Sequence, residues 1–299
     1  MGGDCQPYYC CERMTFMPDR KIREMVRGRK TTDGAGVHLV RVLGPATVEA
    51  FDPFLMLDSF DSRNPDDYTA GFPMHPHRGI ETITYLIAGE IDHEDSLGNA
   101  GRIGPGQSQW MTAGSGIMHQ EMPQPAERML GLQLWLNLPR EDKMTAPQYF
   151  DITSALIGEK PVDGGLVRVI SGSYAGVRGA QPSYIPATIY DVTLQPDASL
   201  TLPTSPQDNV FVFLIEGDAV IEGGTIAEKT AVLFGEGDSV TVAATAEASA
   251  RFIFCAGKPL HEPVAWGGPI VMNTDAELDQ AFAELNTGRF IRHSAKQHN

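Results

Sequence analysis

The stretch that decides the fold is Met74-His75-Pro76-His77-Arg78-Gly79-Ile80-Glu81, together with a later partner, Gly114-Ser115-Gly116-Ile117-Met118-His119-Gln120-Glu121. Successive side chains of a strand point to opposite faces, so His75 and His77 share one face of their strand. His119 and Glu121 share a face of the second strand for the same reason. If the two strands are neighbours, three imidazoles and one carboxylate converge inside a small barrel. This arrangement predicts a metal site with open coordination positions.

The residue types at this site suit iron. Neutral imidazole and carboxylate oxygen are good donors to a borderline divalent metal, and the absence of cysteine argues against a closed structural zinc site. Four protein ligands on an octahedral ion leave two positions for water, dioxygen or a substrate. Four other histidines have no such arrangement and are interpreted as surface or core residues: His38, His93, His261 and His293.

Length and composition indicate two β domains without a membrane span. The 299 residues exceed the usual size of one hydrophobic core. The 31 glycines and 21 prolines separate short apolar runs, which favours an all-β architecture. No run approaches the roughly 18 consecutive apolar residues of a membrane span, and the first residues do not form a secretory signal. We therefore expect a cytoplasmic protein.

The formal net charge of -15 is unevenly distributed along the chain. Residues 1–30 carry seven basic and four acidic side chains, which leaves -18 on the remainder. A body with this charge repels phosphate backbones, so direct nucleic-acid binding is not expected.

The cysteines do not form a disulfide framework, given the size and expected compartment of the chain. Cys255 lies in an apolar run and is predicted to be a core residue. The other three lie in residues 1–20, which we interpret as a disordered N-terminal arm with exposed thiols: Cys5, Cys10 and Cys11.

The strand pattern predicts two barrels in tandem. Residues 139–149 are charged and contain proline, and they are the predicted linker between a first domain, 21–145, and a second, 146–299. The second domain repeats the first in outline. Aligning Gly217 with Gly89 places Pro203 and Ser205 opposite the two histidines of the first strand, so the second barrel is predicted to lack the metal site.

One helix is predicted near the C-terminus, at about 274–287. Thr274 and Glu277 have the spacing of a capping box, and Gly288 is the expected helix stop. Apolar residues at helical spacing predict that this helix packs across a barrel surface.

Several longer strings resemble the pirin family, a group of bicupins within the cupin superfamily. They are HPHRGIET (75–82), HEDS (93–96), QWMTAGSGIMHQEMP (109–123), GPIVMNT (268–274) and GRF (288–290). The resemblance covers roughly residues 20–292. It implies two cupin barrels, the first holding one mononuclear iron, most simply Fe²⁺, although other divalent metals suit the same donors.

The resemblance also implies the ligand set, which is His75, His77, His119 and Glu121. In the general cupin pattern the carboxylate ligand is instead the residue matching Glu81, so Glu81 is the alternative to Glu121. A carboxylate at the ion could accept a hydroxyl proton from a bound substrate, which makes Glu121 the predicted catalytic base.

Two roles follow from the family. The first is a quercetin 2,3-dioxygenase activity, in which dioxygen opens the central ring of a flavonol with loss of carbon monoxide. The second is that of an iron-dependent, redox-sensitive regulatory protein that binds a protein partner. A purely structural metal is a third interpretation. The complete ligand set favours the enzyme, with a flavonol or similar phenol and dioxygen as substrates.

Overall fold

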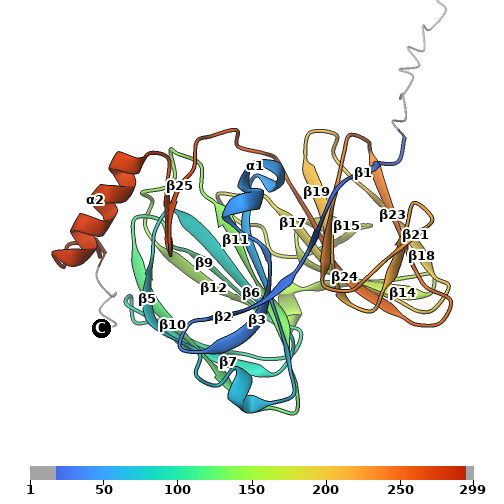
Figure 1. Ribbon diagram of the computed structural model, residues 1–299, viewed down its shortest axis with the longest axis horizontal. Coiled ribbons are helices and arrows are strands. Elements are labelled where there is room, and N and C mark those ends of the chain that lie inside the picture. The colour runs from blue at the N-terminus through green and yellow to red at the C-terminus, as the bar shows by residue number, and fades with distance from the viewer. Residues whose placement is uncertain (1–17, 294–299) are drawn as a thin grey trace, which may run out of the picture.

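The computed structural model describes residues 18–293, which form two β-barrels lying side by side (Figure 1). Each barrel combines a seven-stranded sheet with a four-stranded sheet. The predicted all-β fold with two tandem barrels is therefore confirmed. No helix in the described chain is long and apolar enough to cross a membrane.

The first barrel contains both predicted ligand stretches. Its large sheet consists, in order, of β12 (Gln148–Ile152), β9 (Ser108–Thr112), β6 (Ile80–Ala88), β11 (Met129–Asn137), β4 (Phe54–Ser62), β3 (Val37–Leu43) and β2 (Arg29–Asp33). Its small sheet consists of β5 (Phe72–His77), β10 (Ile117–Gln124), β7 (Glu90–Asp95) and β8 (Ala100–Ile103). The short helices η1 (Pro45–Thr47), α1 (Val48–Phe51) and η2 (Pro65–Asp67) lie in its connections.

The second barrel repeats this layout. Its large sheet consists of β1 (Ile22–Arg27), β22 (Thr230–Phe234), β19 (Asn209–Glu216), β24 (Ala250–Gly257), β17 (Thr188–Leu194), β14 (Gly165–Ser171) and β13 (Gly158–Val162). Its small sheet consists of β18 (Ser199–Pro203), β23 (Ser239–Ala244), β20 (Ala219–Ile221) and β21 (Gly224–Ile226). The connections carry η3 (Ser154–Leu156) and a two-stranded ribbon, β15 (Ser173–Tyr174) with β16 (Val177–Arg178).

The two strand orders match position by position, which supports the predicted internal duplication. The exception is the origin of one edge strand. In the first barrel β12, from the end of that barrel's sequence, pairs with β9, whereas in the second barrel β1, from the start of the chain, pairs with β22. The strand pairing therefore differs from the predicted boundaries. Residues 22–27 belong to the second barrel's sheet, and residues 148–152 belong to the first.

The segment expected to be a disordered arm also differs from the prediction where it is described. Asp19 forms a bridge with Ser239, and the buried Arg20 donates to Thr204 Oγ1 at 2.8 Å. Residues 18–20 are thus ordered against the second barrel. The rest of the predicted arm, including its three cysteines, lies outside the described residues.

A shared apolar core joins the two large sheets. Ile83 and Leu134 of the first sheet lie in one buried cluster with Phe211 and Ile253 of the second. Cys255 is fully buried in the same cluster, which confirms its predicted place in the core. The two barrels therefore pack face to face through their large sheets.

The barrel interiors differ in content. Apolar side chains from both sheets fill the second barrel, among them Leu202, Val212, Val240 and Phe254. In the first barrel the apolar clusters occupy separate regions, with polar side chains between them on β5, β6 and β10. Among the residues that the structure describes, this difference leaves room for a polar interior in the first barrel and not in the second.

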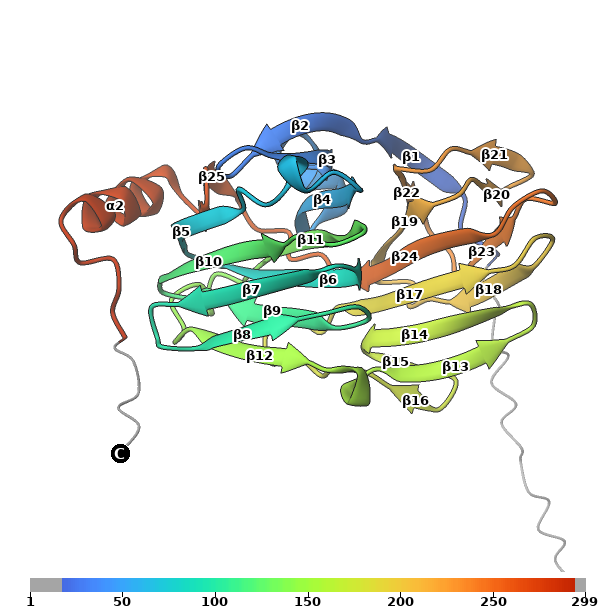
Figure 2. The same ribbon diagram turned by 90° about the horizontal axis from the view of Figure 1, so that it is seen from below.

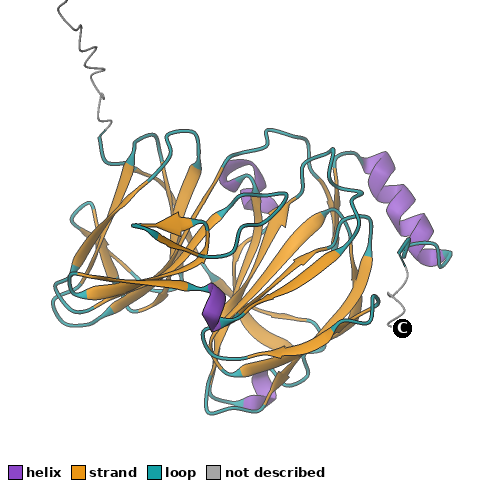
Figure 3. Ribbon diagram, turned by 180° about the vertical axis from the view of Figure 1, so that it is seen from behind, coloured by secondary structure: helices purple, strands orange, loops and turns teal. Residues whose placement is uncertain are grey.

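The C-terminal segment returns to the first barrel. It forms the ribbon β25 (Ala265–Gly267) with β26 (Ile270–Met272) and then α2 (Asp275–Asn286). Thr274 accepts from the Glu277 amide and Glu277 accepts from the Thr274 amide, so the predicted capping box is confirmed. Figures 2 and 3 show α2 at the outer end of the first barrel, away from the second. Residues 265–293 thus lie against the first barrel, unlike the predicted division.

Candidate metal centre

The two stretches that carry the predicted ligands form neighbouring antiparallel strands, as expected. β5 pairs with β10, and His75 lies directly opposite His119 in the register. The nearest ring nitrogens of His75, His77 and His119 all lie within 4.8 Å of one another. Within the described chain this is the one cluster of three or more histidine, cysteine or acidic side chains with metal-site spacing.

Backbone carbonyls fix the tautomers of two of these histidines. The Nδ1 atom of His75 lies 3.0 Å from the Pro73 oxygen, and that of His77 lies 3.0 Å from the Pro269 oxygen. A carbonyl only accepts, so both protons reside on Nδ1. Both Nε2 atoms then carry lone pairs, and they face each other at 3.0 Å. Facing lone pairs repel unless a cation lies between them.

His119 completes the fit to a metal. Both of its ring nitrogens are buried and neither has a hydrogen-bond partner in the described chain. A buried polar atom without a partner lowers the stability of the folded protein unless a ligand or ion binds it. Two cis ligands at about 2.1 Å from a metal lie about 3 Å apart, which matches the separation of the two Nε2 atoms. The donor set therefore fits a divalent transition metal.

Burial keeps these imidazoles neutral. It lowers the pKa of His77 to about 3, with a further contribution from His75. Burial also lowers the pKa of His119 well below its ordinary value, and it lowers the pKa of His75. Neutral imidazole is the form that binds a metal.

Glu121 lies on the same strand and lines the adjacent cavity, but it does not join the three-histidine cluster. The Thr84 hydroxyl lies 2.6 Å from Glu121 Oε1, and Gln133 Nε2 donates to Oε2 at 3.2 Å. Burial raises the pKa of this carboxyl. The structure thus brings three of the four predicted ligands together and holds the fourth beside them.

Glu81, the alternative carboxylate, lies on the other face of its sheet. Opposite residues of paired strands point to the same side, and Glu81 is opposite Leu136, which packs in the core between the barrels. Gln133 and Trp135, which line the cavity, lie opposite Thr84 and Thr82. The turn at Gly79, which has a positive φ, interrupts the regular alternation of side chains between β5 and β6. Glu81 therefore points away from the histidines.

Gly79 is required at that turn. Its φ is +77°, a conformation that favours glycine, and a Cβ there would lie 2.0 Å from the Val271 carbonyl oxygen. The Val271 amide in turn donates to the Arg78 oxygen at 3.1 Å. The Lys143 ammonium, buried within the predicted linker, donates to the Gly79 and Val271 oxygens. The linker and the C-terminal segment together support the ligand strand.

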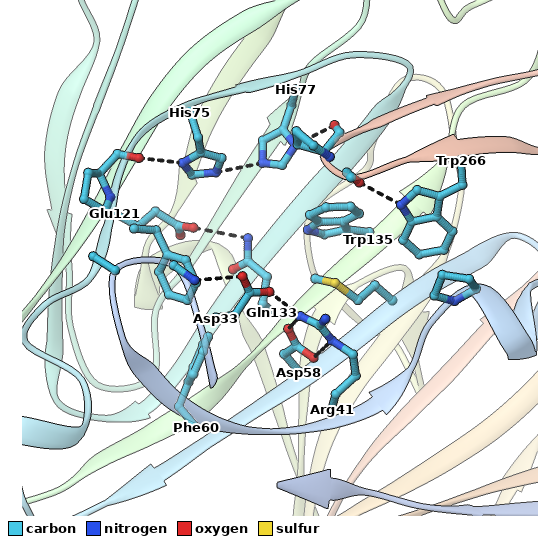
Figure 4. Close-up of a pocket in the computed structure, with 18 residues that line it drawn as sticks. Asp33, Arg41, Asp58, Phe60, His75, His77, Glu121, Gln133, Trp135 and Trp266 are labelled. Atoms are coloured by element: carbon cyan, nitrogen blue, oxygen red, sulfur yellow. Dashed lines mark hydrogen bonds and ion pairs between the residues drawn. The ribbon is translucent and has the colours of Figure 1, made fainter. Parts of the chain in front are cut away.

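A cavity of about 650 Å³ opens beside His75 and His77 (Figure 4). This volume lies within the range of small-molecule sites. The Trp135 ring meets His77 edge-on at 4.9 Å between centroids, and Trp266 lies 5.9 Å from Trp135 at an interplanar angle of 33°. The cavity therefore has aromatic walls next to the histidines.

Sequence reasoning missed these wall residues. The alternation in Leu130-Gly131-Leu132-Gln133-Leu134-Trp135 separates the leucines, which face the second barrel, from Gln133 and Trp135, which face the cavity. That pattern could have identified both. The strand pattern gave no signal for Trp266 and Pro269, because they reach the site only through the return of the C-terminal segment.

His93 also faces this interior, since it lies opposite Glu121 in the register of β7 and β10. It is buried and hydrogen-bonds to the Tyr149 hydroxyl, which also donates to Asp151 at 2.8 Å. This agrees with its interpretation as a satisfied core residue.

Comparison with known proteins matches both barrels. The pirin family model matches residues 36–136, and the model of the pirin C-terminal cupin domain matches residues 189–291. A pirin-like protein of Caulobacter vibrioides is 44% identical over 92% of this chain and all of its own length. Pirin of Homo sapiens is 40% identical over 90% of this chain and 93% of its own.

A solved structure agrees with these matches. The crystal structure of quercetin 2,3-dioxygenase from Acinetobacter baumannii is 33% identical, with a TM-score of 0.84 over 91% of this chain and 99% of its own. The two family models and the relatives, which align over 93% and 100% of their own length, lead to the same assignment. This chain belongs to the pirin family.

Proposed function

We propose that this protein is a metal-dependent dioxygenase of the quercetin 2,3-dioxygenase type, which opens the central ring of a flavonol with dioxygen and releases carbon monoxide. The observation that carries the proposal is the neutral cluster of His75, His77 and His119 at the wall of a cavity of about 650 Å³. The similarity to the Acinetobacter baumannii dioxygenase supports it. We also propose that the protein acts in the cytoplasm, as expected from its sequence.

We propose iron, most simply Fe²⁺, as the metal, held by the three histidines with Glu121 as fourth ligand. When bound, the metal would supply Lewis acidity toward a substrate hydroxyl and a site for dioxygen. The chain itself orients the histidines through the Pro73 and Pro269 carbonyls. It also buries two of the three histidines, because His77 and His119 are each only 1% exposed.

In this proposal Glu121 accepts the proton of the substrate hydroxyl. Its carboxylate lines the cavity, and Thr84 and Gln133 hold both of its oxygens in place. A carboxylate fixed within hydrogen-bond reach of a bound hydroxyl is the geometry that a general base requires. The Trp135 and Trp266 rings orient a flat aromatic substrate beside it.

The decisive experiment combines metal analysis with oxygen consumption. Elemental analysis of the purified protein identifies the metal, and an oxygen electrode measures dioxygen uptake with a panel of flavonols and simpler phenols. We expect uptake with flavonols and release of carbon monoxide. Absence of uptake by the metal-loaded protein with every flavonol would refute the proposal.

A second candidate is an iron-dependent, redox-sensitive regulatory protein that binds a protein partner. The contact between His77 and Pro269 favours it, because a movement of the ligand would be transmitted to the C-terminal segment at the surface. Pull-downs with ferrous, ferric and metal-free protein test this candidate. Recovery of the same partners in all three states would contradict it.

A further inference from the structure

The wall of the cavity across from the histidines carries an arginine held between two carboxylates (Figure 4). Arg41 Nε donates to Asp58 Oδ1 at 2.9 Å, and Arg41 Nη2 donates to Asp58 Oδ2 at 2.7 Å. Nη2 also donates to Asp33 Oδ2 at 2.5 Å. The Asp58 side chain is 4% exposed, whereas those of Arg41 and Asp33 are 35% and 49% exposed. The buried Asp58 thus holds the Arg41 guanidinium in place, while Arg41 and Asp33 remain accessible from the cavity.

Both accessible groups keep unused hydrogen-bonding capacity. Arg41 Nη1 donates to no residue of the described chain, since its bonds there come from Nε and Nη2. Asp33 accepts from Arg41 and from the Gly34 amide, and a carboxylate has about four acceptor positions. A donor and an acceptor therefore lie side by side at this end of the cavity.

The space between the two ends suits a flat ring system. Met56, Trp135, Trp266 and Pro269 line it with apolar surface. One end presents histidine nitrogens and the other presents the pair Asp33 and Arg41. A flat aromatic molecule that binds at the histidines would extend its far ring toward this pair.

We propose that Asp33 and Arg41 bind two adjacent hydroxyls on the far ring of the substrate and thereby select flavonols that carry a catechol ring. One hydroxyl donates to the Asp33 carboxylate, and the neighbouring hydroxyl oxygen accepts from Arg41 Nη1. A ring without hydroxyls desolvates both charged groups and satisfies neither. This inference rests on the proposed function, because it assumes that the substrate hydroxyl on the metal side lies at the histidines.

The test compares three flavonols that share one core and differ in the pendant ring. Quercetin has two adjacent hydroxyls there, kaempferol has one and galangin has none. Isothermal titration of the metal-loaded protein without dioxygen measures binding apart from turnover. We expect affinity to fall from quercetin to kaempferol to galangin. Asp33→Asn should weaken quercetin binding roughly tenfold and change galangin binding by less than about twofold.

Two further variants keep the test interpretable. Arg41→Lys keeps a positive charge beside the buried Asp58 and removes Nη1. It should therefore also weaken the binding of quercetin more than that of galangin. Asp92→Asn is the matched control, because Asp92 pairs with Arg102 at a comparable exposure but lies outside the cavity. If Asp33→Asn unfolds the protein, Asp33→Ser replaces it.

The outcomes separate this inference from the proposed function. Equal affinity for the three flavonols, or an equal loss for all three in Asp33→Asn, overturns the inference even if dioxygen is consumed. Selective binding without dioxygen consumption supports the inference and contradicts the proposed function. Absence of flavonol binding overturns both.

Discussion

The Nδ1 atom of His77 lies 3.0 Å from the carbonyl oxygen of Pro269, 192 residues further along the chain. A proposed metal ligand of the first barrel, His77, is therefore oriented by the C-terminal segment. The next residue, Arg78, anchors the same segment. Its buried guanidinium donates to the Phe290 oxygen at 3.0 Å and pairs with Glu284 of α2 at 2.9 Å. Such contacts outside the ligand set tune metal affinity.

Glu284→Gln should weaken metal binding without touching a ligand. The change removes the charge that pairs with the buried Arg78, so we expect a loss of about 2 kcal/mol in the free energy of unfolding. The loosened segment should also hold His77 less firmly and lower metal affinity by roughly tenfold. Thermal unfolding of the metal-free protein and a competitive metal titration measure the two effects.

The control for this experiment is Asp279→Asn, an exposed residue of the same helix. It should leave both quantities near their wild-type values. If Glu284→Gln lowers the unfolding temperature but binds metal as tightly as wild type, the C-terminal segment supports the fold only and does not orient His77.

The carboxylate ligand can be identified by paired substitutions. Glu121 lines the cavity beside the histidines, whereas Glu81 points to the opposite face of the sheet. We therefore expect Glu121→Gln to lower metal affinity and dioxygen consumption by at least tenfold, and Glu81→Gln to leave metal content unchanged. Elemental analysis and oxygen-electrode measurements on both variants check this. The reverse pattern would identify Glu81 as the ligand.

His119→Ala tests whether the histidine cluster holds the metal. This side chain has no other hydrogen-bond partner in the described chain, so its removal breaks no protein contact of that kind. We expect loss of bound metal together with loss of dioxygen uptake, while the far-ultraviolet circular dichroism stays that of the wild type. Metal retained at one ion per chain would show that the site lies elsewhere.

Much of the site was predictable because it depends on local periodicity. The alternation of His75 with His77, and of His119 with Glu121, is a property of each strand alone, and it correctly predicted that the three histidines meet. The alternation does not extend from His77 to Glu81, the alternative carboxylate of the general cupin pattern, because a glycine with positive φ separates the two. A count of residues from the histidines cannot detect that turn.

The domain boundaries were not predictable from pattern, because long-range pairing determines them. β1 precedes the first barrel in sequence but pairs with β22 of the second. The charged segment before β12 has the composition of a linker, yet its Lys143 is buried beneath the C-terminal segment. Local composition contains no information on which sheet edge a strand completes.

The interface between the barrels offers a test of stability that is separate from the metal site. The Tyr85 hydroxyl of β6 donates to Asp191 Oδ2 of β17 at 2.6 Å and accepts from Arg168 at 2.7 Å. Tyr85→Phe leaves the buried Asp191 with one donor fewer, so we expect a loss of about 1–3 kcal/mol in the free energy of unfolding. Denaturant unfolding measures this loss, and metal content should not change. A loss below about 0.5 kcal/mol would show that this contact between the barrels is dispensable.

Glu81 should make stability fall as pH rises. Burial, which the hydrogen bond from Thr112 to Oε1 offsets only in part, raises the pKa of this carboxyl from 4.5 to about 7. Between those values the folded protein holds a proton that the unfolded chain has released, so the free energy of unfolding decreases across this window, by roughly 3 kcal/mol. We therefore expect the free energy of unfolding of Glu81→Gln, measured by denaturant unfolding relative to that of the wild type, to be higher at pH 8 than at pH 5. The comparison cancels contributions common to both proteins, including the histidines. A constant difference at both pH values would mean that Glu81 titrates normally in the folded protein.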